Sequence, residues 1–305
     1  MEYNTIIETT KEQSKKLRDA YYKMFYILGG AFLAGFIVAL PIAGSINSNL
    51  MVLAIVVWVA VMIFIGVKAY DKYKILKQFM KENVVQRILE KHFNQVQYRP
   101  EEGFEQEFIR NTEMIQMGNI YSSNDYLSGE YKGVTFSQSD VTIKDRRRSG
   151  KHTYTVTLFQ GRWLVYQFNK KFDGYLQLRD TEKSIFGKNK KPYSFFSVLP
   201  EMNHLTFEND QFNEAFTAYS SNPHEAYYLI TPHFMEKILK LDKKIDCQVI
   251  FGFINNELHV ACYNGENAFE VATEEVNQQT IKKVEDDLQL IKDIIDYLDI
   301  DVKIT

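Results

Sequence analysis

The residues with the clearest chemical potential are basic and lie in short polar loops. Lysine and arginine side chains that converge on an anionic surface each contribute about 1 kcal/mol to binding. We therefore expect contact with an anionic surface or a partner through Arg146, Arg147, Arg148, Lys151, Lys188, Lys190 and Lys191. The alternative is that these charges only keep exposed strand ends soluble.

Catalytic and metal-binding motifs are missing from the sequence. The stretch 224–228 begins like the H-E-x-x-H zinc motif, but Tyr228 stands where the second histidine must be. The sequence has no Walker A loop, no G-x-G-x-x-G turn and no G-x-S-x-G elbow. We therefore expect no catalytic residue, cofactor or metal, and a binding protein is favoured over an enzyme.

The two cysteines, Cys247 and Cys262, lie in apolar stretches that resemble strands. Two cysteines are too few for a disulfide framework, and they lack a C-x-x-C metal spacing. We expect reduced core residues, since a reactive thiol needs an electropositive and partly exposed setting.

A C-terminal amphipathic helix has the most regular apolar period in the chain. Its apolar residues alternate at spacings of three and four, which is typical of a coiled-coil seam. The pattern predicts either self-association of a homo-oligomer or docking of the helix on its own sheet, through Ile281, Val284, Leu288, Ile291, Ile295 and Leu298.

Two uncharged segments near the N-terminus, about 24–46 and 50–67, are each close to the length that crosses a bilayer. Lysines and arginines lie before the first segment and after the second, and the turn 47–49 has none. The sequence therefore predicts a transmembrane hairpin integral to the plasma (inner) membrane, with both termini cytoplasmic. A cleaved signal peptide is the alternative, but the first segment is long and a second follows.

We predict an α+β protein with two parts. Residues 1–97 form the membrane anchor, with a helical stalk after the second span, and residues 98–305 form a cytosolic domain with a curved antiparallel sheet and packed helices. Strands are expected at 131–143 and 154–168 around a polar turn at 145–150, and at 248–254 and 258–263. Residues 1–92 hold 12 Lys and Arg against 7 Asp and Glu, whereas residues 93–305 hold 24 against 32, so a nucleic-acid partner is unlikely.

Several short patterns resemble an uncharacterised bacterial membrane-protein family, the domain of unknown function numbered thirty-one thirty-seven. They follow one another along nearly the whole chain, as the segments 98–103, 125–129, 133–136 with Asp140, 159–163, 212–216 and 225–232. The resemblance implies the paired N-terminal spans. The family has no established activity, so the resemblance implies no site residue.

These observations favour a membrane-tethered cytosolic binding or adaptor module that contacts a protein partner or anionic lipid at the inner membrane surface. The alternative is a ligand-binding receptor or an unrecognised enzyme that acts on lipid or cell-envelope material.

Overall fold

The computed structural model describes residues 2–39, 41, 45, 48–167, 172–181 and 202–300. Its contacts divide the chain into two compact units. Unit 1 comprises Met1–Ile88 and Glu270–Val284, and unit 2 comprises Leu89–Phe269 and Glu285–Thr305.

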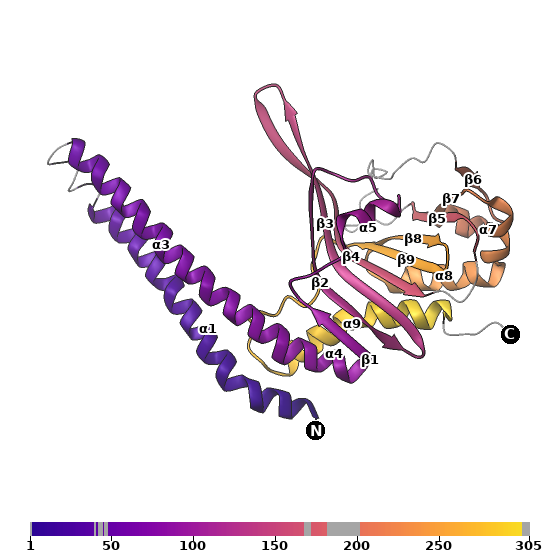
Figure 1. Ribbon diagram of the computed structural model, residues 1–305, viewed down its shortest axis with the longest axis horizontal. Helices are drawn as coiled ribbons and strands as arrows, with labels where there is room; N and C mark the ends of the chain where they lie inside the picture. Colours follow the sequence, from indigo (N-terminus) through magenta and orange to yellow (C-terminus); the bar gives the residue numbers. More distant parts are fainter. Residues whose placement is uncertain are drawn as a thin grey trace. The chain divides into compact units, whose positions relative to one another are not determined.

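Unit 1 contains a hairpin of two long helices (Figure 1). Its elements are α1 Glu2–Ala34, the π-helix η1 Gly35–Ala39, α3 Ser48–Met80, the π-helix η2 Lys81–Val85 and the start of α4 Gln86–His92. Trp58 of α3 donates a hydrogen bond from Nε1 to the carbonyl oxygen of Ala31 in α1, at 3.1 Å. Both helices are long and apolar enough to cross a membrane.

Tyrosines mark one end of the apolar stretch of the hairpin. The Tyr21 and Tyr73 rings, on α1 and α3, lie 5.7 Å apart, next to Tyr22 and within three residues of Lys23 and Tyr70. Tyrosine and lysine are enriched where a membrane helix leaves the hydrocarbon region. This level of the hairpin therefore fits a membrane–water interface.

The second long helix continues beyond its apolar stretch without a break as far as His92. Leu76, Met80, Val84 and Ile88 are at most 1% exposed, as their helical spacing predicts. α1 accompanies this extension, because Nη1 of Arg87 donates to Oγ1 of Thr9 at 3.2 Å. The helix that contains the second apolar segment therefore extends well beyond it.

Unit 2 is built on one antiparallel sheet of nine described strands, in the order β1-β2-β3-β4-β9-β8-β5-β7-β6. The strands are β1 Asn94–Arg99, β2 Ile120–Tyr131, β3 Val134–Ser149, β4 His152–Gln167, β5 Tyr175–Asp180, β6 Asn203–Leu205, β7 Phe216–Ser220, β8 Gln248–Ile254 and β9 Glu257–Tyr263. Its helices are α5 Gln106–Asn111, α6 Asp210–Ala215, α7 Pro223–Leu229, α8 Pro232–Lys244 and, from Glu285 onward, α9 Gln278–Leu298. The mixed helical and antiparallel-sheet class is confirmed.

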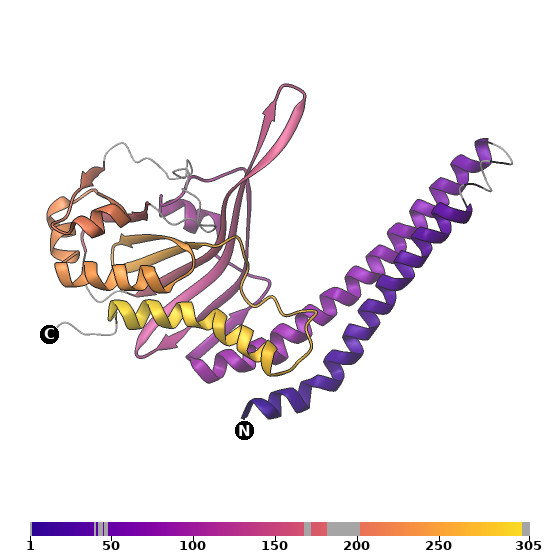
Figure 2. The same cartoon turned by 180° about the vertical axis from the view of Figure 1, so that it is seen from behind.

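The two faces of the sheet carry different helices. On one face, Tyr166 of β4 donates to the carbonyl oxygen of Ile291 in α9, and α8 lies beside α9 (Figures 1 and 2). On the other face, Trp163 and Val165 pack with Ile109 of α5 in an apolar cluster. This division follows from the strand period of two, which sends alternate β4 side chains to opposite faces.

The local helix and hairpin signals in the second half of the chain are largely confirmed. The β8–β9 hairpin forms with the expected bounds to within one residue. Thr231 caps α8, because its side chain accepts a hydrogen bond from the amide of Phe234, and Pro232 occupies the first turn.

The predicted polar turn at 145–150 is wrong. β3 and β4 remain paired from Lys144 with Thr157 as far as Ser149 with His152, so the chain turns only at Gly150-Lys151. Backbone pairing continues through the arginines because charged side chains are tolerated on a two-stranded ribbon that is exposed on both faces. This ribbon extends past the other strands of unit 2 (Figure 1).

The expectation of reduced cysteines is also wrong, because Cys247 and Cys262 form a disulfide. Cys262 is paired with Val249 in the β8–β9 ladder, and Cys247 immediately precedes β8. This diagonal placement holds the two Cα atoms 5.6 Å apart, which is within the span of a disulfide.

Candidate functional site

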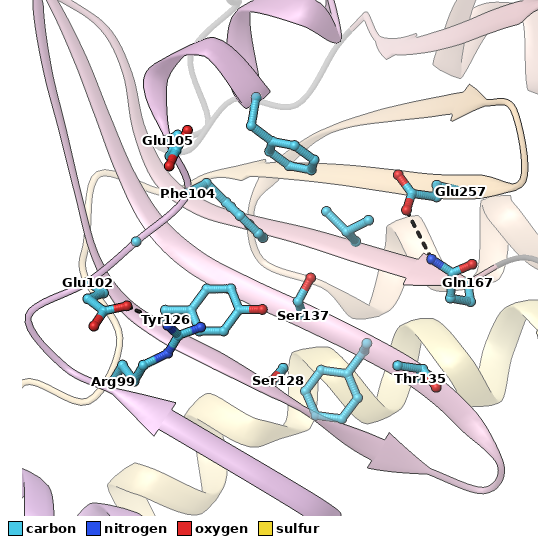
Figure 3. A pocket seen from close by; sticks show the side chains of 14 residues that line it. Arg99, Glu102, Phe104, Glu105, Tyr126, Ser128, Thr135, Ser137, Gln167 and Glu257 are labelled. Atoms are coloured by element: carbon cyan, nitrogen blue, oxygen red, sulfur yellow. Dashed lines mark hydrogen bonds and ion pairs between the residues drawn. The ribbon is translucent and has the colours of Figure 1, made fainter.

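A groove of about 560 Å³ lies on the α5 face of the sheet in unit 2 (Figure 3). Its floor comes from β2, β3, β4 and β9, and its wall comes from the segment that joins β1 to α5. The strand register decides which side chains of the floor enter it.

Small hydroxyl side chains form the centre of the floor. Ser128 of β2 is paired with Ser137 of β3, which is paired with Val165 of β4. Paired residues in an antiparallel sheet project to the same face, so these three side chains form a row across the strands. The row leaves room above it, since serine is small and Val165 presents only methyl groups.

Aromatic rings form the wall. The rings of Phe104 and Phe108 are stacked with centroids 4.9 Å apart, and the ring of Tyr126 meets Phe104 edge-on at 5.8 Å. The backbone of Phe104 is held at both ends, because its amide donates to Oγ of Ser139 and its carbonyl accepts from the Tyr121 hydroxyl. Phe108 is nevertheless 36% exposed, so a flat apolar surface is available to a ligand.

A carboxylate at one end of the groove is fixed by a hydrogen-bond chain. Nε1 of Trp163 can only donate, and it donates to Nδ1 of His259, so Nδ1 accepts and the ring N–H toward Glu257 is on Nε2. Nε2 of His259 lies 3.2 Å from Oε2 of Glu257, and Nε2 of Gln167 donates to Oε1 of Glu257 at 2.9 Å. The hydrogen bond from His259 lowers the pKa of Glu257, although burial partly opposes it. Glu257 is therefore a positioned negative charge.

The other end of the groove already holds a guanidinium group. The Arg99 guanidinium lies 4.5 Å from the centre of the Tyr126 ring, and its Nη1 is 2.6 Å from Oε2 of Glu102. Figure 3 shows this pair and Glu257 at opposite ends, with Ser137 between them. Glu105 also lines the groove, so three carboxylates face one arginine and the groove is acidic.

The basic residues predicted from the sequence lie elsewhere on unit 2. Arg146, Arg147, Arg148 and Lys151 are exposed on the ribbon of residues 144–157, which we call the arm. The predicted residues Lys188, Lys190 and Lys191 lie outside the described residues. Of the predicted basic residues, the structure thus places these four on one hairpin.

The two faces of the arm differ in charge. Lys144, Arg146 and Arg148 share one face, because they alternate along β3, and their partners across the ladder are Thr157, Thr155 and Thr153. Arg147 points to the opposite face, where its Nε lies 2.8 Å from Oδ2 of Asp145. The hydrogen bond that Arg147 donates to Asp145 raises the pKa of Arg147. One face of the arm is therefore cationic without an acid among its paired residues.

The C-terminal seam is covered within the single chain. Its six residues are at most 3% exposed, and they are Ile281, Val284, Leu288, Ile291, Ile295 and Leu298. In unit 2, Arg162 and Tyr166 of β4 donate to the backbone carbonyls of Asp287 and Ile291. This burial agrees with the alternative in which the helix docks on its own sheet.

No three histidine, cysteine, aspartate or glutamate side chains among the described residues are grouped to hold a metal ion. A second cavity of about 350 Å³ is lined by the disulfide, Arg162 and Asp287. The guanidinium of Arg162 already donates a hydrogen bond to the backbone carbonyl of Asp287.

The groove was not anticipated from the sequence. Glu102, Ser137 and Glu257 are far apart along the chain, and only the sheet order β2-β3-β4-β9 brings their surroundings together. The single local signal was the pair Phe104 and Phe108, four residues apart in an otherwise acidic stretch.

No curated protein matches the chain. A solved structure that matches is described as the crystal structure of the mycobacterial trehalose monomycolate transport factor A, TtfA, with 13% identity and a TM-score of 0.34 over 68% of this chain and 93% of that chain. Residues 157–300, from β4 to the end of α9, match the model of the family described as protein of unknown function (DUF3137), which confirms the family resemblance expected from the sequence.

Proposed function

We propose that this chain is a membrane-anchored binding module whose acidic aromatic groove accepts a basic, extended segment of a protein partner. The observation that carries this proposal is that the fixed carboxylate of Glu257 and the exposed ring of Phe108 line the same groove. Guanidinium groups bind carboxylates in a planar fork and stack on aromatic rings, so this combination suits arginine better than lysine.

The state of Glu257 supports binding over acid catalysis. A general acid near neutral pH needs a raised carboxyl pKa, whereas the pKa of Glu257 is lowered. Its two oxygens are also held by Gln167 and His259, which orients a fixed acceptor. A carboxylate of this kind serves ion pairing with a ligand.

The helical hairpin of unit 1 supplies the anchor in this proposal. Lysines and arginines flank both apolar segments and are missing from the turn, which favours cytoplasmic placement of both termini and of unit 2. The module would then present its groove to a partner at the inner face of the plasma membrane.

Peptide binding to the full chain in lipid nanodiscs tests the proposal. Fluorescent peptides of equal length, with arginine, lysine or glutamate alternating with threonine, are titrated and followed by anisotropy. We expect the order arginine, then lysine, with no binding of the glutamate peptide, and weaker binding at high salt because exposed ion pairs are screened.

The double variant Glu102→Gln and Glu257→Gln should lower the affinity for the arginine peptide at least tenfold. Glu130→Gln is the matched control, since Glu130 is a carboxylate of β2 that does not line the groove. Equal affinity of the double variant and the control, or equal binding of the arginine and glutamate peptides, would overturn the proposal.

A further inference from the structure

The arm and the groove lie at opposite ends of the same two strands. The groove uses Thr135 and Ser137 near the start of β3, whereas the arm begins at Lys144 of that strand. Building on the proposed function, we infer that the basic segment accepted by the groove is the arm of a second copy of this chain.

A chain cannot place its own arm in its own groove. Ser137 and Arg146 are nine residues apart on one continuous strand, which corresponds to about 30 Å at about 3.3 Å per residue. The arm cannot fold back, because its two strands are paired to the tip. The side-chain amide of Asn119 also donates to the carbonyl oxygen of Arg146 at 3.0 Å and accepts from the amide of Arg146 at 2.9 Å. The occupant must therefore come from another molecule.

The cationic face of the arm matches the groove in length. From Lys144 to Arg148 is four residues, or about 13 Å of strand. The groove extends from β9, which carries Glu257, across β4 and β3 to β2. Glu102 lies beside β2, because the amide of Tyr126 donates a hydrogen bond to the carbonyl oxygen of Glu102. Three strand spacings of about 4.8 Å make that crossing about 14 Å. Lys144, Arg146 and Arg148, which are two and four residues apart, therefore fit between the two acidic ends.

The arm also matches the groove in chemistry. One guanidinium is already bound in the groove, because Arg99 stacks on the ring of Tyr126 and forms an ion pair with Glu102. The Phe104–Phe108 pair and Glu257 offer the same two kinds of contact at the other end. Thr153 and Thr155, which share the cationic face with Arg148 and Arg146, bring hydroxyls toward the serines of the floor.

The contact joins two different surfaces, so it is head-to-tail. Each chain offers one arm and one groove, and a heterologous contact of this kind produces rings or open arrays that grow with concentration. The seam of α9 plays no part, because it is covered within each chain.

A complementation experiment on the full chain in detergent micelles tests the inference. The arm variant carries Arg146→Glu and Arg148→Glu, and the groove variant carries Glu102→Gln and Glu257→Gln. Mass photometry should show wild-type assemblies that grow with concentration, whereas each variant alone stays monomeric. An equimolar mixture should form one-to-one heterodimers that stop at two chains, because only one arm and one groove in each pair are competent.

Thermal melting of each variant shows that it is folded, and Arg147→Glu, on the other face of the arm, should assemble like wild type. A monomeric wild type at all concentrations, variants that assemble alone, or a mixture that stays monomeric would overturn the inference. Arginine-peptide binding separates this failure from that of the proposed function. If the wild type binds the peptide but does not assemble, the groove is a binding site and the second copy is not its partner.

Discussion

Glu257 is the groove residue whose charge is most firmly held, and its protonation should therefore be visible in stability. A hydrogen bond from His259 lowers its pKa from the ordinary value of 4.5, so the folded state favours the ionised form. This contribution is present above about pH 4.5 and is lost as the pH falls through the lower, folded-state pKa.

We expect Glu257→Gln to flatten the melting temperature of the full chain against pH below 4.5. Glu105→Gln, at the exposed margin of the same groove, is the control and should keep the wild-type slope. Scanning calorimetry in nanodiscs between pH 3 and 7 measures both. An unchanged slope in Glu257→Gln would mean that the hydrogen bond from His259 does not favour the carboxylate.

Asp140 is a buried carboxylate that holds a neighbouring backbone segment by a hydrogen bond. It is 1% exposed, and its Oδ2 accepts a hydrogen bond from the amide of Ala268 at 2.7 Å. Removing a charged acceptor from a buried donor costs about 1.5–3 kcal/mol. Asp140→Ala should therefore lower the melting temperature by several degrees, whereas Glu130→Ala on the neighbouring strand should change it little; equal shifts would contradict this role.

At the residue scale, the sequence reveals charge but does not reveal proximity. The arginine tract 146–148 is contiguous, so its clustering could be predicted directly. The groove could not be predicted, because Glu102 and Glu257 come to line one groove only through the order and register of four strands. The disulfide was missed for a different reason: the β8–β9 hairpin that brings its cysteines together was predicted, but two cysteines in apolar strands were interpreted as reduced core residues.

At the scale of elements, local signals predicted some strands well and others poorly. The β8–β9 hairpin was found because two apolar runs flank Asn255-Asn256. β2 was not expected, because its polar residues show no clear alternation and a register shift between Asn124 and Leu127 interrupts the period. The polar residues of the arm predict a turn, but pairing of β3 with β4 within the same hairpin makes them part of a strand.

The disulfide joins two elements that the ladder already pairs, so it should act mainly on the unfolded chain. A loop of 15 residues corresponds to about 3 kcal/mol in the chain-entropy account. The double variant Cys247→Ser and Cys262→Ser should lower the melting temperature of the oxidised full chain by about 6–10 °C. The same variant compared with the reduced wild type should show a much smaller difference; equal deficits in both comparisons would assign the effect to packing.

At the scale of the whole molecule, the sequence predicted the apolar hairpin because its signal is compositional and continuous. The run 50–67 is uncharged, and the helix that contains it continues to His92. What composition could not show is that unit 1 also includes Glu270–Val284, which returns from the far end of the chain. Lys77 and Lys81 lie 4.0 and 3.9 Å from the Glu270 carboxylate, a contact across nearly two hundred residues.

The orientation of the hairpin and the redox state of the cysteines make linked predictions. Cytoplasmic thiols are kept reduced, whereas disulfides persist on the outer side of the membrane. If both termini are cytoplasmic, as the flanking lysines and arginines favour, cells quenched in acid and alkylated after denaturation should yield Cys247 and Cys262 as free thiols. The same pair should then become a disulfide once the protein is purified in air.

Reporter fusions at the two termini and within the turn 47–49 determine the orientation independently. We expect activity of a cytoplasmic reporter at both termini and of an exported reporter at the turn. A disulfide already present in quenched cells, together with exported termini, would contradict the rule based on lysine and arginine and would place the groove outside the cell. A disulfide in cells with cytoplasmic termini would instead mean that the burial of both cysteines, at most 5% exposed, protects the bond from cellular reductants.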